Sequence, residues 1–193
     1  MTKDELCEAL NYVNASRSKR YKMARTIEEN LHLIPILIEI IKDDIDPISS
    51  KASWVLEYVA HKDLRPIFNN IDLFINSLQT ITLESSVRPV SKICQFLVLS
   101  ECSRKNTKKE KILTEQHLCA ITESAFDWLI GEHKVAPKAY SMTTLLHIGN
   151  HIPWIHPELQ LILQQNYEKG SAAYKARARM TLKILEKKYS SKS

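Results

Sequence analysis

The chain has 193 residues, a net charge of +5, 44% hydrophobic residues and only three glycines. This length and balance predict a single water-soluble domain, residues 1–193, and the scarcity of glycine disfavours sheets and hairpins, whose tight turns use it. No run of 18 apolar residues is present and MTKDELCEAL does not resemble a signal peptide, so we expect a cytoplasmic protein without membrane contact.

The N-terminal segment predicts two helices. Thr2 and Glu5 have the spacing of a capping box at the start of the first helix. A second, more basic helix is expected from Ser16 to Asn30. Its inward-facing residues are expected to be Tyr21, Ala24 and Ile27.

Residues 31–60, LHLIPILIEIIKDDIDPISSKASWVLEYVA, predict two helices joined by an acidic turn. Asp46 is placed to cap the second helix and Pro47 to take its first position, where no N–H is needed. Pro35 lies inside an apolar run and predicts a kink. The first turns of later helices are expected to contain Pro66, Pro89, Pro137 and Pro157.

A repeat becomes visible when the second helices of the predicted pairs are aligned. Each begins with a basic residue, followed by small or polar residues and then an apolar run. These basic residues are Lys51, Arg88, Lys138 and Lys175, at spacings of 37, 50 and 37. A polar, basic insert near residues 100–112 accounts for the longer interval. With the N-terminal pair, the pattern predicts five helix pairs, or ten helices, with no sheet.

The stretch 31–60 resembles a HEAT repeat, with a proline in an apolar first helix, an aspartate-rich turn and a basic residue early in the second helix. The chain also resembles small bacterial HEAT-like proteins that are sometimes labelled adenylosuccinate lyase. The resemblance implies an all-α, armadillo-like α-α superhelix that binds partners on a concave face. A lyase of that kind uses a GSSxMPxKxN loop, to which neither APKAYSMTTLL nor GSAAYKARARM corresponds.

The regular basic residues form the candidate binding site, which we call the basic ladder: Lys51, Arg88, Lys92, Lys138, Lys175, Arg177 and Arg179. The ladder can bind an anion, or its members can pair with carboxylates in the turns of neighbouring repeats. Available carboxylates are Asp43, Asp44, Glu84, Glu132 and Glu168. We favour the structural interpretation, with Arg88 as the best candidate for a two-bond pair.

Two other basic segments have simpler interpretations. The insert SRKNTKKEK predicts a solvated loop, although its charge also suits an acidic partner. The last helix can lie on a membrane or in a partner's groove, but we expect its apolar face to close the array. That face comprises Ala173, Ala176, Met180 and Ile184.

No catalytic, cofactor or metal motif is recognisable. P-loop, GxGxxG, GxSxG and HExxH patterns are absent. His147 and His151 lie four residues apart near His156, but Gly149 interrupts the helix between them and no third ligand follows. We therefore expect no metal and no cofactor, and favour a protein that is not an enzyme.

The leading functional hypothesis is an adaptor that binds a protein partner on the concave face. The alternative is a nucleic-acid-binding protein related to alkylpurine DNA glycosylases, which are HEAT-like and use aromatic, aspartate and basic residues. Asp127 and Trp128 do not reproduce that set, because neighbours on a helix point about 100° apart. The expected core comprises Leu37, Ile40, Trp54, Leu56, Phe74, Ile93, Leu97, Phe126, Leu145, Leu161 and Leu182.

Overall fold

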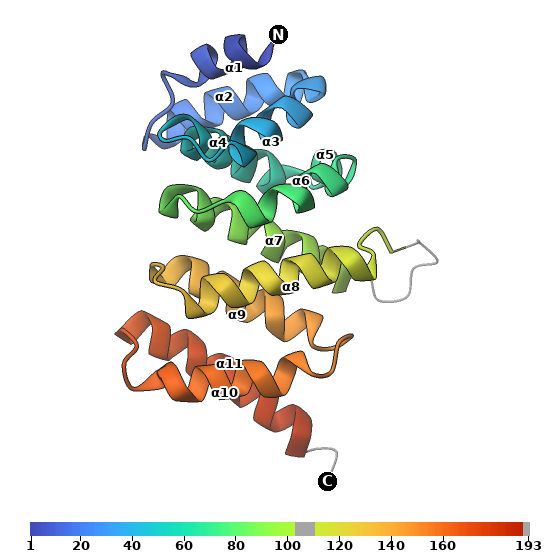
Figure 1. Ribbon diagram of the computed structural model, residues 1–193, viewed down its shortest axis with the longest axis vertical. Helices are drawn as coiled ribbons and strands as arrows, with labels where there is room; N and C mark the ends of the chain where they lie inside the picture. The colour runs from blue at the N-terminus through green and yellow to red at the C-terminus, as the bar shows by residue number, and fades with distance from the viewer. Residues whose placement is uncertain (103–110, 191–193) are drawn as a thin grey trace. The chain divides into compact units, whose positions relative to one another are not determined.

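The computed structural model describes residues 1–102 and 111–190, and within these ranges every regular element is a helix (Figure 1). The prediction of an all-α protein is therefore confirmed for the described residues. No helix among them is long and apolar enough to span a bilayer. Most of the basic insert, residues 103–110, lies outside them.

The described ranges contain eleven α-helices and two short 3-10 helices. The α-helices are α1 Lys3–Leu10, α2 Arg17–Glu29, α3 Ile34–Lys42, α4 Ile48–Lys62, α5 Arg65–Phe68, α6 Ile71–Ser77, α7 Glu84–Cys102, α8 Glu115–Ile130, α9 Val135–Ile148, α10 Ile155–Tyr167 and α11 Ala172–Ser190. The 3-10 helices are Leu31–Leu33 and Leu78–Thr80. One more α-helix is present than the ten predicted, because α5 and α6 are separate segments interrupted at Asn69 and Asn70.

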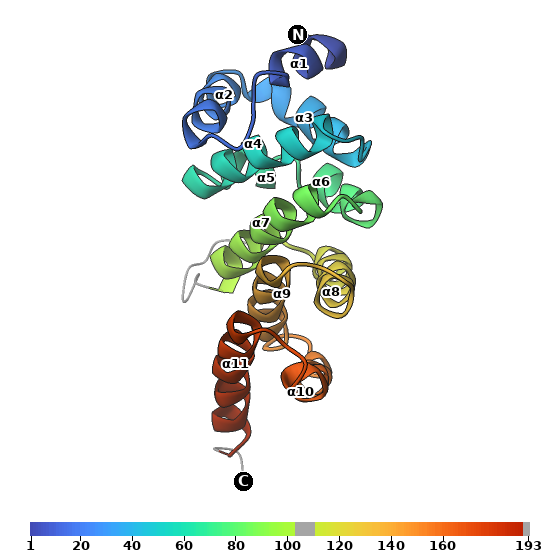
Figure 2. The same ribbon diagram turned by 90° about the vertical axis from the view of Figure 1, so that its left-hand side faces the viewer.

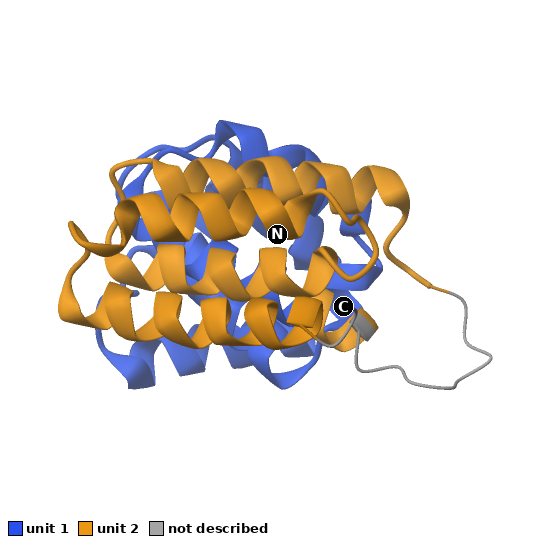
Figure 3. Ribbon diagram, turned by 90° about the horizontal axis from the view of Figure 1, so that it is seen from below, with its two compact units in different colours: residues 1–97 blue, residues 98–193 orange. Residues whose placement is uncertain are grey.

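The chain divides into two compact units, residues 1–97 and 98–193, with the boundary inside α7 (Figure 3). In unit 1, α3 packs against α1, α4 and α6, while α4 also packs against α2 (Figure 2). The predicted core residues Leu37, Leu56 and Phe74 are completely buried there. The predicted capping box is confirmed, since Glu5 N–H donates to Thr2 Oγ1 at 3.3 Å and Thr2 N–H donates to Glu5 Oε2 at 2.8 Å.

In unit 2, α9 lies at the centre of the packing. It contacts α8, α10 and α11, and α10 also contacts α11. Leu145 of α9 is completely buried, as are Leu163 of α10 and Leu185 of α11. Helix α9 ends before Gly149, where the sequence predicted an interruption.

Two expectations about prolines in the 31–60 stretch are wrong. Pro35 does not kink a helix, because α3 begins only at Ile34 and the proline falls in its first turn, where no helical hydrogen bond is lost. Pro47 precedes α4 as its N-cap residue, and no side chain caps this helix. Asp46 instead accepts a hydrogen bond from the Ser50 hydroxyl at 3.3 Å.

Pro89 was expected in the first turn of its helix, but it lies inside α7, which begins at Glu84. A proline has no N–H to donate to the carbonyl four residues earlier, here that of Ser85. The indole nitrogen of Trp54, on α4, donates to this carbonyl at 3.0 Å. The gap in the helical hydrogen bonding is thus satisfied by a side chain from another helix.

The expected core is largely correct, with errors of helix phase. Leu161 is 48% exposed, because α10 turns Leu159, Ile162 and Leu163 inward instead. Trp54, Phe126 and Leu182 are half-buried. Tyr21 is exposed, while Met23, Ala24 and Ile27 form the buried side of α2.

Candidate anion-binding site

The four repeated basic residues lie early in four different helices. Lys51 is in α4 and Arg88 in α7, both within unit 1. Lys138 is in α9 and Lys175 in α11, both within unit 2. Each lies within the first two turns of its helix, where a cation opposes the helix dipole and gains from a nearby negative group.

Their partners in unit 1 differ from the turn carboxylates considered for them. Lys51 Nζ donates to the Asn11 carbonyl at 2.8 Å. Arg88 makes a two-bond pair with Glu57 of α4, at 2.8 and 3.4 Å. Arg88 is therefore fixed in the geometry expected of it, but its carboxylate comes from the middle of a neighbouring helix.

In unit 2, one basic residue pairs with a turn carboxylate. Lys175 lies 3.6 Å from Glu168, whose side chain is 89% exposed, so the pair is screened by solvent. Arg179 donates to the Tyr167 hydroxyl at 3.0 Å. Lys138 and Arg177 have no ion-pair or hydrogen-bond partner for their side chains among the described residues.

Arg88 and Lys92 line a cavity of about 310 Å³ in unit 1 together with six residues that were not predicted for the site. The six come from three helices. Arg17 and Arg20 belong to α2, Glu57, Tyr58 and His61 belong to α4, and Phe96 belongs to α7, which also carries the two ladder residues. Four of the eight side chains are cationic and one is a carboxylate. We call this cavity the basic pocket.

Arg20 is held in one orientation inside the basic pocket. Its guanidinium lies over the Trp54 indole, 4.3 Å from the ring centroid. Its Nε donates to the Asn14 carbonyl at 3.0 Å, which leaves the two terminal amino groups available to a ligand. Trp54 is itself fixed by its bond to Ser85. The protein therefore sets the positions of both the indole ring and the guanidinium that stacks on it.

The electrostatic environment of Arg20 favours an added anion. Partial burial, followed by the like charge of Arg88, lowers the pKa of Arg20 below its usual range. An arginine stays protonated in a protein, so the lowered pKa expresses an unfavourable environment for its charge. Glu57 offsets this in part, but it is already bonded to Arg88.

An aromatic wall completes the basic pocket. Lys92 Nζ lies 4.9 Å from the centroid of the Phe96 ring and donates to Gln95 Oε1 at 3.0 Å. The ring centroids of Phe96 and His61 are 5.6 Å apart. The rings of Phe96 and His61 therefore lie beside the cations of the pocket. Because they offer a surface on which a larger group can pack, the pocket can hold an anion that is attached to such a group.

The residues missed by the sequence analysis carried a weak signal. Phe96 lies four residues after Lys92, which in turn lies four after Arg88, so Phe96 shares a helix face with two predicted residues. Trp54 and Glu57 are one turn apart on α4, in the arrangement of aromatic and acidic residues that was sought only around Asp127. Nothing in the sequence indicated that α2 brings Arg17 and Arg20 to the same place.

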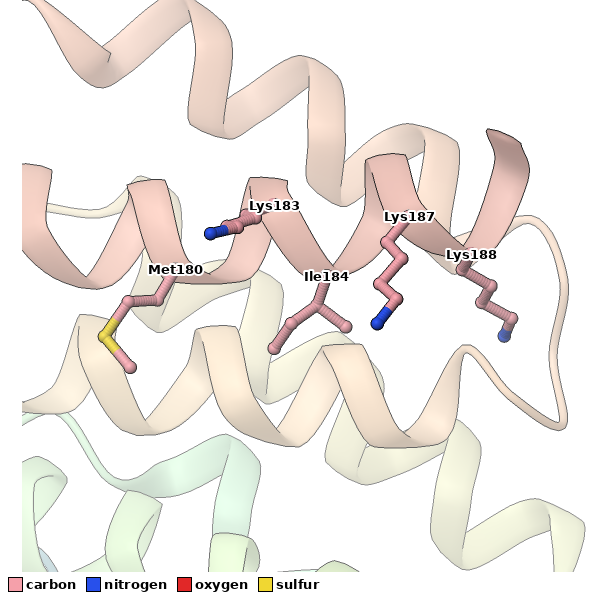
Figure 4. A pocket seen from close by; sticks show the side chains of 5 residues that line it. All are labelled: Met180, Lys183, Ile184, Lys187 and Lys188. Atoms are coloured by element: carbon pink, nitrogen blue, oxygen red, sulfur yellow. The ribbon is translucent and has the colours of Figure 1, made fainter. Parts of the chain in front are cut away.

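The apolar face assigned to the last helix is wrong. Met180 and Ile184 are 60% and 52% exposed, and Ala173 and Ala176 are also exposed. Met180 and Ile184 border an open groove with Lys183, Lys187 and Lys188 (Figure 4). The side of α11 that is buried contains Tyr174, Ala178, Thr181 and Leu185.

Both ring nitrogens of His156 lie at hydrogen-bond distance from neighbouring helices. His156 Nε2 lies 2.9 Å from the Leu146 carbonyl oxygen, and Nδ1 lies 3.2 Å from the Tyr189 hydroxyl. In the described ranges, no three His, Cys, Asp or Glu side chains gather as metal ligands.

Comparisons of the chain with protein-family models, with curated proteins and with solved structures found no match. The functional assignment therefore rests on the geometry of the basic pocket.

Proposed function

We propose that this protein is a non-catalytic, HEAT-like helical-repeat adaptor whose basic pocket binds an anionic group on a protein partner. One observation carries the proposal: Arg17 and Arg20 meet at a cavity whose single lining carboxylate, Glu57, is already paired with Arg88. Neither Arg17 nor Arg20 has a carboxylate at ion-pair distance among the described residues. A cavity with this excess of positive charge favours a negatively charged ligand.

The repeat architecture is supported by the packing within each unit. In unit 1 the contacts α1–α3 and α2–α4 link alternate helices, and α3–α6 does so when α5 and α6 are counted as one interrupted helix. In unit 2 the contact α9–α11 does the same. Stacked helix pairs produce such contacts between alternate helices, and proteins of this type commonly act as binding scaffolds.

The test compares the proteins that co-purify with the wild-type chain and with two variants. Arg17→Glu reverses an exposed lining charge and removes no described contact. Lys19→Glu makes the same change on the same helix outside the pocket lining. A partner that binds through the pocket is lost with Arg17→Glu and retained with Lys19→Glu. Equal recovery with both variants contradicts the proposal.

A second candidate function is nucleic-acid binding. It is favoured by an aromatic, an acidic and a basic residue at this site, because Glu57 and Arg88 line the cavity and Trp54 stacks with Arg20, which also lines it. Aromatic, acidic and basic residues are also combined in the glycosylases named above. Titration of labelled single-stranded and duplex oligonucleotides at low and high salt tests it. Binding through several phosphates weakens steeply with salt, and no binding at micromolar protein and low salt eliminates this function.

A further inference from the structure

We infer that the anion bound in the basic pocket is a phosphate monoester, carried either on a side chain of a partner or on a small molecule. The inference rests on the proposed function and specifies the ligand of the same site. It is drawn from the number of uncompensated charges in the pocket, the fixed geometry of Arg20 and the confinement of the charge to one cavity.

The charge of the ligand follows from the two arginines of α2. Neither Arg17 nor Arg20 is matched by a carboxylate of its own in the part of the chain that the structure describes. A phosphate monoester carries about −1.5 to −2 charges at pH 7, whereas a phosphodiester or a carboxylate carries one. Two guanidinium groups at one cavity are therefore better neutralised by the monoester.

The geometry of Arg20 suits phosphate oxygens. Stacking on Trp54 and the bond from Nε to Asn14 fix the plane of its guanidinium. The remaining amino groups form a planar fork, which binds two oxygens of one phosphate. Because this fork is ordered before binding, little side-chain entropy is lost when the ligand arrives.

The positive charge of the pocket is confined to one cavity and does not continue to the other ladder residue of unit 1. Lys51, the other ladder residue of unit 1, is bonded to the Asn11 carbonyl and does not line the pocket. Proteins that bind nucleic-acid strands place basic residues along several consecutive phosphates. A cavity of about 310 Å³ is at the small end of the range for ligand pockets, and it suits one phosphate with part of the group that carries it.

Calorimetric titration of the full chain with phenyl phosphate and dimethyl phosphate tests the inference. The second pKa of a phosphate monoester is about 6, so phenyl phosphate binding should tighten about tenfold from pH 5 to pH 7.5, because the dianion gains a further charge-assisted hydrogen bond. Dimethyl phosphate stays singly charged, and its binding should be weak and independent of pH. The protein groups that face the ligand are Arg17, Arg20, Glu57, Tyr58, His61, Arg88 and Lys92.

Variants separate the pocket from other effects. The pH series is repeated with His61→Gln, which removes the histidine from the pocket lining. Arg17→Glu and Arg20→Gln should each weaken phenyl phosphate binding at least tenfold, and Lys19→Glu should leave it within twofold. A peptide containing phosphoserine and a nucleoside 5′-monophosphate distinguish the two sources of the monoester by their relative affinities.

The outcomes are distinct for the inference and for the proposed function. Equal and pH-independent binding of phenyl and dimethyl phosphate overturns the inference that the ligand is a phosphate monoester. The adaptor proposal still holds in that case if Arg17→Glu loses its partner. Absence of phenyl phosphate binding at millimolar concentration also overturns the inference. Retention of every partner by Arg17→Glu overturns the proposed function itself.

Discussion

Trp54 donates its indole N–H to the carbonyl oxygen of Ser85, and this acceptor is available because Pro89 follows four residues later. The bond joins α4 to the start of α7 within unit 1. It also fixes the ring on which Arg20 stacks. A proline inside a helix thereby determines the position of a cation in the basic pocket.

Trp54→Phe should reduce the free energy of unfolding by about 1 kcal/mol, because the Ser85 carbonyl loses its donor. The loss should be smaller in a Pro89→Ala background, where the restored N–H can bond to the same carbonyl. Urea unfolding of the two single variants and the double variant measures the coupling between these positions. Equal losses in both backgrounds would show that the indole bond does not compensate for the proline.

Glu57→Gln should tighten phenyl phosphate binding about fivefold, since it removes the negative charge that competes with the ligand. Calorimetry at pH 7.5 measures the change. Glu28→Gln is the matched control, because Glu28 pairs with Lys62 in the same unit but does not line the basic pocket. Weaker binding by Glu57→Gln would mean that the orientation of Arg88 matters more than the charge of its partner.

Gly149→Ala should destabilise the protein by about 1–3 kcal/mol through overpacking. A Cβ at this position would lie 2.9 Å from Cγ of His156 and closer still to two other ring atoms. The ring is buried and held by Leu146 and Tyr189, so it has little freedom to move. In a His156→Ala background the same substitution should be nearly neutral, and thermal unfolding of the four proteins checks this.

Stability should fall as the pH drops below about 6.5, the ordinary pKa of histidine. Burial lowers the pKa of His147 and of His156, for which Lys188 acts in the same direction and the bond to Leu146 opposes it. The unfolded chain then binds protons more readily than the folded chain, so this stability is complete above pH 6.5 and is lost below it. The difference between urea midpoints at pH 7.5 and pH 5.5 should shrink in His147→Gln/His156→Gln.

Ile184→Ala and Leu185→Ala form a matched pair on α11. Leu185 is completely buried and Ile184 is 52% exposed. Truncating Leu185 should cost about 2–5 kcal/mol, whereas truncating Ile184 should change stability by less than about 0.5 kcal/mol. The reverse order in urea unfolding would contradict the observed orientation of α11.

Local patterns predicted the start of α1 and the two helices around the acidic turn, because a capping box and an apolar run act within one or two turns. The phases of α10 and α11 were harder to predict. Ile184 and Leu185 are consecutive apolar residues, and only packing against other helices decides which of them is buried. Periodicity therefore indicates that a helix forms more reliably than it indicates which side faces inward.

The basic pocket could be predicted only in part for a similar reason. Arg88 and Lys92 belong to the repeat pattern, and a two-bond pair for Arg88 was expected. Its partner Glu57, however, is 31 positions away and lies in the middle of a helix. Arg17 and Arg20 reach the pocket through the packing of α2 on α4, which has no signature in the spacing of residues along the chain.

Because three helices line the basic pocket, ligand binding also adds to the stability of the folded unit. Its residues extend from Arg17 to Phe96, so the complete set exists only after most of unit 1 has assembled. A ligand that binds this set and not the unfolded chain adds RT ln(1 + [L]/Kd) to the stability of the unit, about 2.7 kcal/mol at a hundredfold excess over Kd. Saturation with the anion should thus protect the backbone amides of α2, α4 and the N-terminal part of α7 from hydrogen exchange, including amides far from any contact with the ligand.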